Sequence, residues 1–76
     1  MKKVTIKLES IQDVRDFVNL VTSQTADIDL TSGRYVVDGK SIMGIFSLDL
    51  LSPIEMTVYS DDCDDLLAKV SKYLVK

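Results

Sequence analysis

The fold of this chain is limited most by three short segments in which apolar and polar residues alternate, at residues 3–9, 26–31 and 54–59. Alternation with a period of two is typical of a strand that buries one side and exposes the other. A fourth segment, residues 34–37, is short and rich in β-branched residues, and it follows a turn signal at Gly33. We therefore expect four strands, the second and third of which form a hairpin. Because each strand has a polar face, the sheet is expected to be mostly antiparallel and covered on one side.

A helix is expected between the first two strands. Ser10 is its predicted N-cap, and Asp13 follows three residues later in an approximate capping box. The apolar residues that follow recur at the spacing of a helix of about three turns. They are Ile11, Val14, Phe17, Val18 and Val21.

Two further helices are expected in the second half of the chain. A short one opens at Ser41 and reaches about Leu50, because Pro53 cannot continue it. The last one begins within residues 61–65 and runs close to Lys76, with acidic residues at its start and lysines towards its end, as the helix dipole favours. Its apolar stripe consists of Leu66, Leu67, Val70, Tyr73 and Leu74.

The expected order of elements is β-α-β-β-α-β-α, an α+β arrangement. Three helices over one face of a four-stranded sheet bury the apolar side of every element economically. The chain of 76 residues suits a single domain, residues 1–76, with a small core.

Charge and cysteine content argue against several classes of function. The net charge is −3 and only nine basic residues are scattered along the chain, so neither nucleic acid nor an anionic membrane surface is an expected partner. No apolar run is long enough for a signal peptide or a membrane span, which favours a cytoplasmic location. The single cysteine, Cys63, cannot form an internal disulfide, and this fits a reducing compartment.

The most distinctive motif runs from Lys40 to Leu48 and reads Lys-Ser-Ile-Met-Gly-Ile-Phe-Ser-Leu. It resembles the second-helix motif of HPr, the small phosphocarrier of the bacterial sugar phosphotransferase system. Counted back without gaps, residues 26–30 fall on the family's second strand, and Gly33 falls at its hairpin turn. The resemblance covers nearly the whole chain and implies an HPr-like open-faced β-sandwich.

The same resemblance bears on function at the start of the first helix. HPr proteins carry a Gly-Ile-His-Ala-Arg-Pro-like segment there, whose histidine takes a phosphoryl group and whose arginine helps to hold it. This chain has no histidine, and the ungapped count puts Ser10 at the histidine position and Gln12 at the arginine position. A serine phosphate ester is too stable to be passed on, and Glu9 and Asp13 would repel an incoming phosphoryl group. We therefore predict an HPr-related protein that is not a histidine phosphocarrier; residual carriage on Ser10 is the least favoured alternative.

Ser41 aligns with the serine that many Gram-positive HPr proteins present to a dedicated kinase. A phosphate in the first turn of a helix meets free backbone N–H groups and the positive end of the dipole, and Lys40 adds a positive charge. The resemblance thus implies a regulatory phosphorylation site. The alternative is that Ser41 is only an N-cap, which stabilises a helix by about 1 kcal/mol.

The second helix has more apolar residues than one buried side can hold. A helix packed from one side buries about half its circumference, so Ile42, Met43 and Phe46 are expected to stay exposed. The corresponding face of HPr proteins docks partner proteins, a role that methionine and aromatic side chains suit. We predict a protein-binding surface of Lys40, Ile42, Met43 and Phe46. The alternatives are that loops cover this patch or that a second copy covers it in a homodimer.

No enzymatic, metal or cofactor site is predicted. Gly39, Lys40 and Ser41 copy the end of a phosphate-binding loop, but Arg34 stands where that pattern needs glycine. The acidic run near residue 63 lacks the spacing and central glycine of a calcium loop, and acidic residues are common at a helix start. This run consists of Asp61, Asp62, Asp64 and Asp65. Nothing in the sequence pairs a nucleophile with a base and an orienting group.

Two functional hypotheses remain. The first is a non-catalytic, regulatory HPr relative that binds a protein partner and is switched by phosphorylation at Ser41. The second is a constitutive interaction or scaffolding module, with or without self-association, in which Ser41 is only a cap.

Overall fold

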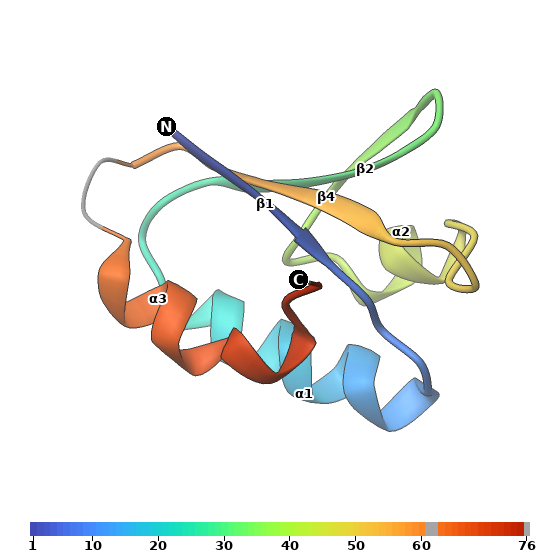
Figure 1. Ribbon diagram of the computed structural model, residues 1–76, viewed down its shortest axis with the longest axis horizontal. Coiled ribbons are helices and arrows are strands. Elements are labelled where there is room, and N and C mark those ends of the chain that lie inside the picture. The colour runs from blue at the N-terminus through green and yellow to red at the C-terminus, as the bar shows by residue number, and fades with distance from the viewer. Residues whose placement is uncertain (61–62, 76) are drawn as a thin grey trace.

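The computed structural model describes residues 1–60 and 63–75 and shows a single sheet with its two longer helices below one face (Figure 1). The first half comprises β1 (Lys2–Ile6), α1 (Ile11–Thr22), β2 (Ile28–Ser32) and β3 (Tyr35–Asp38). The second half comprises α2 (Ile42–Phe46), β4 (Ile54–Val58), α3 (Asp64–Lys69) and a 3-10 turn, η1 (Ser71–Tyr73).

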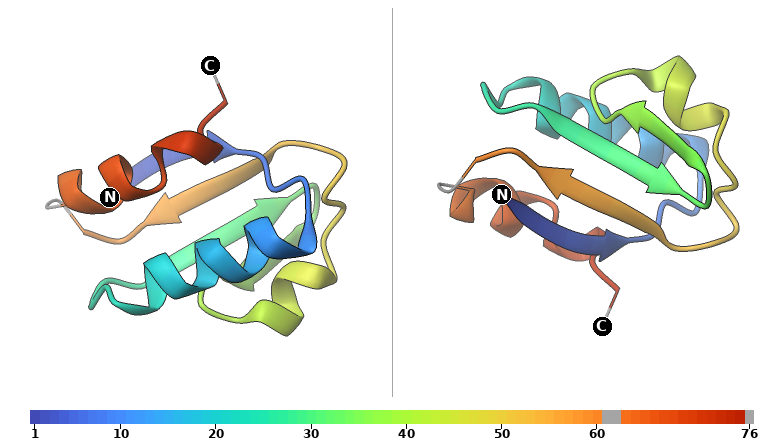
Figure 2. Two further views of the ribbon diagram at one scale, coloured as in Figure 1. Left: turned by 90° about the horizontal axis from the view of Figure 1, so that it is seen from below. Right: turned by 90° about the horizontal axis from the view of Figure 1, so that it is seen from above.

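The sheet has the strand order β1-β4-β2-β3, and all three neighbouring pairs are antiparallel. The hairpin of β2 and β3 turns at Gly33, which has a φ of 60° that glycine adopts without strain. Figure 2 shows α1 and α3 lying side by side under the sheet, with α2 at the end where α1 begins. The α+β class, the order of elements and the antiparallel sheet agree with the sequence-based prediction.

The core lies between the sheet and the two longer helices. Phe17 of α1 is fully buried, and its ring meets that of Tyr73 edge-on, with 6.0 Å between centroids and 78° between planes. Alternate residues of the central strands point into the same layer, as their sequence pattern predicted. These strand residues are Ile28, Leu30, Ile54, Met56 and Val58.

The second helix is shorter than the sequence suggested. It ends at Phe46 rather than near Leu50, because Ser47 caps it and donates its hydroxyl to the carbonyl of Gly44. The carboxylate of Asp49 then accepts the backbone N–H of Leu51 at 3.0 Å. Serine and aspartate side chains compete in this way with helical backbone bonds, so the segment turns early.

The predicted long final helix is also wrong. Helix α3 stops at Lys69, a 3-10 turn follows, and Leu74 then pairs with Ile6 as an antiparallel bridge. The N–H of Lys7 donates to the carbonyl of Tyr73 at 2.8 Å, and the N–H of Val75 donates to the carbonyl of Thr5 at 2.9 Å. The backbone groups on the outer side of β1 need partners, and residues 73–75 supply them.

Smaller differences concern the ends of strands. Strand β1 stops at Ile6 although Leu8 is fully buried, and β2 begins at Ile28 rather than at residue 26. Within the part of the chain that the structure describes, no helix combines the length and apolar character needed to span a membrane.

Candidate functional site

The start of α1 is closed by its own side chains. The hydroxyl of Ser10 accepts the N–H of Asp13 at 3.1 Å, which confirms the predicted N-cap. The carboxylate of Asp13 reaches back to accept the N–H of Glu9 at 3.0 Å, one residue earlier than in the usual capping box. The hydroxyl and carboxylate thus lie where an anion would otherwise meet the helix dipole.

Gln12 takes no part in this cap. Its amide nitrogen donates to the carboxylate of Asp16 at 2.9 Å, one turn further along the exposed side of α1. The structure therefore does not bring Ser10 and Gln12 together through a hydrogen bond.

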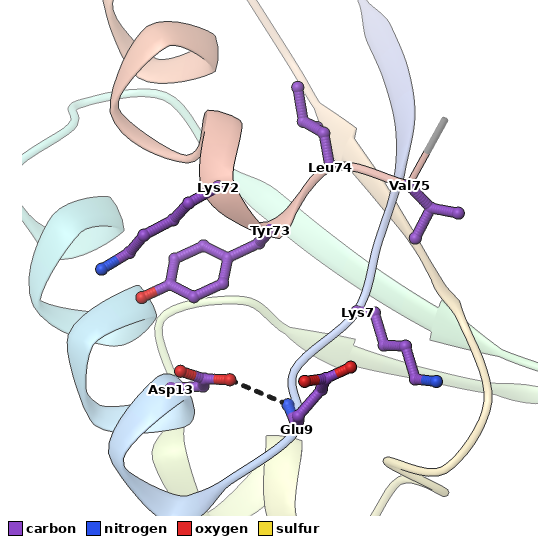
Figure 3. Close-up of a pocket in the computed structure, with 7 residues that line it drawn as sticks. All are labelled: Lys7, Glu9, Asp13, Lys72, Tyr73, Leu74 and Val75. Atoms are coloured by element: carbon purple, nitrogen blue, oxygen red, sulfur yellow. Dashed lines mark hydrogen bonds between the residues drawn. The ribbon is translucent and has the colours of Figure 1, made fainter.

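A pocket lies beside this helix start, between α1, the residues after β1 and the C-terminal segment (Figure 3). Two lysines and two carboxylates line it, so its charges largely balance. The ammonium of Lys72 lies 5.0 Å from the ring centre of Tyr73. The pKa of Lys72 is raised, first by the Tyr73 oxygen and then, more weakly, by the carboxylates of Asp16 and Asp13. The lining residues are Lys7, Glu9, Asp13, Lys72, Tyr73, Leu74 and Val75.

The hydroxyl of Tyr73 is buried, and no described residue lies within hydrogen-bonding distance and geometry of it. A buried polar group without a partner costs folding free energy, whereas its removal relieves that cost. We expect Tyr73→Phe to leave stability unchanged or to raise it by up to about 1 kcal/mol. Urea unfolding followed by circular dichroism measures this, and a clear loss of stability would indicate that the hydroxyl is hydrogen-bonded in solution.

Ser41 occupies the corresponding cap position on α2. Its hydroxyl accepts the N–H of Gly44 at 3.2 Å, and its carbonyl accepts the N–H of Ile45 at 3.0 Å. The segment before it is fixed by two more bonds: Gly39 donates to Ile28 at 2.7 Å, and Ser41 donates to Asp38 at 3.0 Å. Ser41 is half-buried and serves as the helix cap in the unmodified protein.

Lys40 connects α2 to the end of α1. Its ammonium donates to the carbonyl of Gln24 at 2.8 Å, and its N–H donates to the carboxylate of Asp38 at 2.9 Å. The side chain is therefore held at the segment that follows α1 rather than extended into solvent. The ammonium has three N–H groups, so two remain for another acceptor.

The exposed side of α2 contains Met43, at 78% exposure, and Phe46, at 41%. Both were expected to be exposed. Ile42, the third residue expected there, is instead half-buried and packs against the core. Gly44 faces inward, where a Cβ atom would lie 3.2 Å from the Cβ of Val37, so α2 is positioned close to β3.

Two exposed apolar residues near this end of the molecule were not foreseen. Ile11 was assigned to the buried stripe of α1 but is 63% exposed, and Leu51 is 88% exposed. Ile11 is the first residue of α1, which lies at the same end of the protein as α2 (Figures 1 and 2). Its position next to the N-cap could have indicated this exposure, because a side chain in the first turn comes before the part of the helix that the sheet covers.

The acidic residues near α3 do not form a metal site within the described residues. Asp61 and Asp62 lie outside them, and Asp64 and Asp65 are exposed at the start of α3. Among the residues of ranges 1–60 and 63–75, no group of three or more potential ligands from histidine, cysteine, aspartate and glutamate comes together. Cys63 is a buried free thiol.

Solved structures with the same fold were found by comparison. The chain superposes on HPr-C-His from Thermoanaerobacter tengcongensis with a TM-score of 0.79 and 25% identity, over 95% of this chain and 89% of that one. The fold is that of HPr. A phosphocarrier protein HPr from Bacillus anthracis str. Ames matches with a TM-score of 0.71 and 28% identity, over 95% of this chain and 93% of that one. No protein-family model matches the sequence, and no curated protein matches it.

The comparisons support a protein related to phosphocarriers of the HPr kind. The four-stranded antiparallel sheet and three helices of this chain match that fold over almost its full length. The roles of Ser10, Gln12, Lys40 and Ser41 stay predictions.

Proposed function

We infer that this chain is a non-catalytic HPr-related protein of the phosphotransferase system type, which acts by binding a protein partner rather than by carrying a phosphoryl group on histidine. The observation that carries this inference is an HPr fold made by a sequence without histidine. Transfer of a phosphoryl group needs an acceptor from which it can leave again, and the imidazole of the family supplies one. At the start of α1 this chain offers a serine hydroxyl and two carboxylates instead.

The docking surface of this proposal is the exposed side of α2. We define it by Met43 and Phe46, with Lys40 at its border and the half-buried Ile42 beneath. Two large apolar side chains on one short helix suit a partner surface, because aromatic and methionine residues contribute most where they are fully desolvated. Ile11 and Leu51 are two further exposed apolar residues, and Ile11 begins α1 at the end of the protein where α2 lies (Figure 2).

Phosphorylation of Ser41 is proposed as the switch for this surface. A phosphate on its hydroxyl would bring about two negative charges and new hydrogen-bond acceptors next to Met43. The N–H of Gly44 already donates to that hydroxyl, and the preceding residue, Lys40, carries a positive charge. The modification would therefore change the charge at the border of the docking surface without unfolding α2.

The test of the switch is incubation with an HPr serine kinase and ATP, followed by mass spectrometry. We expect one added phosphate in the natural sequence and none in Ser41→Ala. The matched control is Ser10→Ala, which removes the other helix-capping hydroxyl and should still accept one phosphate. Addition to Ser41→Ala, or its loss in Ser10→Ala alone, would contradict the assignment.

A second assay tests the loss of carrier function. With phosphoenolpyruvate and the upstream phosphotransferase enzyme, this protein should acquire no acid-labile label, while an HPr with its histidine should be labelled in the same tube. A label that passes to a sugar permease component would overturn the proposal.

One observation favours the constitutive alternative. The hydroxyl of Ser41 already caps α2, and the ammonium of Lys40 already bonds the carbonyl of Gln24. Both groups thus already have a structural role without a phosphate. If the kinase adds nothing to the natural sequence, the chain is better described as an unswitched interaction module.

A further inference from the structure

The outer edge of β3 is a second exposed apolar surface, in addition to the exposed side of α2. Strand β3 is the last of the sheet and pairs with β2 alone. Tyr35 is 70% exposed and Val36 is 61% exposed. In Figure 1 the tip of the hairpin of β2 and β3 lies away from α1 and α3, while α2 packs beside β3 at Val37.

The hydrogen-bond pattern of the hairpin determines which backbone groups point outward. Gly39 donates to Ile28 at 2.7 Å, which makes their pair a hydrogen-bonded one. Pairs alternate along an antiparallel ladder, so Leu30 and Val37 bond each other, while Thr31 and Val36 do not. The N–H and C=O of Val36 therefore point to the free edge. No backbone hydrogen bond joins them to another described residue.

The side chains along this edge are complementary to those of a second copy of β3 that runs in the opposite direction. If two copies of β3 run antiparallel with Val36 opposite Val36, Arg34, in the hairpin turn just before β3 of each copy, comes next to Asp38, the last residue of β3 of the other. Tyr35 then lies opposite Val37. Opposite charges and pairs of an aromatic with a β-branched residue are the cross-strand neighbours that stabilise antiparallel strands.

We propose that two copies of this chain associate through their β3 edges, antiparallel and centred on Val36. The two Val36 residues exchange a pair of N–H···O=C bonds at the symmetry axis, and Arg34 pairs with Asp38 at each end. Both copies contribute the same patch to the interface, as a closed two-fold dimer requires. This surface is separate from the α2 docking surface and does not depend on the proposed function.

The charges at the ends of the strand select this partner over others. Edge strands are normally protected by short length and by charged residues, and β3 has four residues with Arg34 before it and Asp38 at its end. A neutral strand would offer neither residue an opposite charge, whereas a reversed copy does. The contact is small by the standard of stable complexes, which bury more than about 1,200 Å², so the dimer is expected to be weak.

Sedimentation equilibrium tests the proposal. The average mass of the natural chain, 8.5 kDa as a monomer, should rise towards twice that value between about 10 μM and about 1 mM. Val36→Lys places two ammonium groups opposite each other at the axis and should weaken association about tenfold or more. The matched control is Thr5→Lys, on the opposite edge of the sheet, which should leave association unchanged.

A second variant separates backbone pairing from side-chain repulsion. Val36→Pro removes only an N–H that the hairpin does not use, so the fold should persist by circular dichroism while the dimer is lost. In the natural chain, hydrogen exchange of the Val36 amide should slow as concentration rises. A monomeric mass at every concentration would overturn the proposal, as would a dimer that survives Val36→Lys and is lost in Phe46→Ser.

Discussion

Replacing Phe17 with alanine is expected to remove a large share of the stability of this protein. Phe17 is fully buried where α1 faces the sheet and Tyr73, and its ring is among the largest in the core. Truncation of a buried phenylalanine costs about 3–5 kcal/mol through lost transfer free energy and the cavity left behind. A domain of this size has a total stability of only about 4–11 kcal/mol.

Urea unfolding followed by circular dichroism measures this loss. The control is Ile11→Ala, which truncates an apolar residue of the same helix that is 63% exposed, and it should change stability by less than about 0.5 kcal/mol. Equal losses in the two variants would mean that the helix is packed differently from the arrangement described.

The second large effect is expected at Gly39. A Cβ atom there would lie 2.7 Å from the Cγ2 of Ile28 and 3.1 Å from its carbonyl oxygen. Because the carbonyl belongs to the backbone of a central strand, the strain cannot be relieved by a side-chain rotation alone. Overpacking of this kind costs about 1–3 kcal/mol, and we expect Gly39→Ala to lose stability in that range.

The consequence should extend to the candidate site. Gly39 is followed directly by Lys40 and Ser41, so a shift of its backbone moves the cap of α2. Amide resonances of Ser41 and Gly44 should therefore change in Gly39→Ala. Gly44→Ala is the comparison, because its Cβ would lie 3.2 Å from Val37, a contact that a small adjustment relieves. A loss in Gly39→Ala no larger than in Gly44→Ala would contradict this explanation.

The sequence predicted the sheet well because its strands carry a local signal. Alternation in β1, β2 and β4 reports directly which side of each strand is buried, and Gly33 marks the hairpin turn. The N-caps at Ser10 and Ser41 are equally local, since each depends on a side chain and a backbone N–H three residues away.

The sequence predicted the end of α3 poorly because a distant partner decides it. Leu74 continues the apolar stripe of α3, yet it pairs with Ile6, at the opposite end of the chain. Nothing in the sequence near residue 74 indicates that this segment will form backbone hydrogen bonds with β1. The end of α2 was missed for a different, local reason: Ser47 and Asp49 form side-chain bonds that compete with the apolar spacing of the helix.

For the candidate site, the sequence identified the residue types but not their contacts. The exposure of Met43 and Phe46 followed from counting apolar residues on a short helix. The bond from Lys40 to the carbonyl of Gln24 could not be foreseen, because it depends on how α1 ends beside α2. Ile11 was assigned to the core because helical spacing alone does not show where the sheet stops covering a helix.

The pairing of residues 73–75 with β1 has a consequence for any assembly of this protein. A sheet with two open sides can add copies indefinitely and grow into a fibre. Here the flank beside β1 is already occupied at Thr5 and Lys7 by the chain itself. Association through the opposite flank therefore favours a pair over a fibre, because the outward flanks of such a pair are already partly occupied.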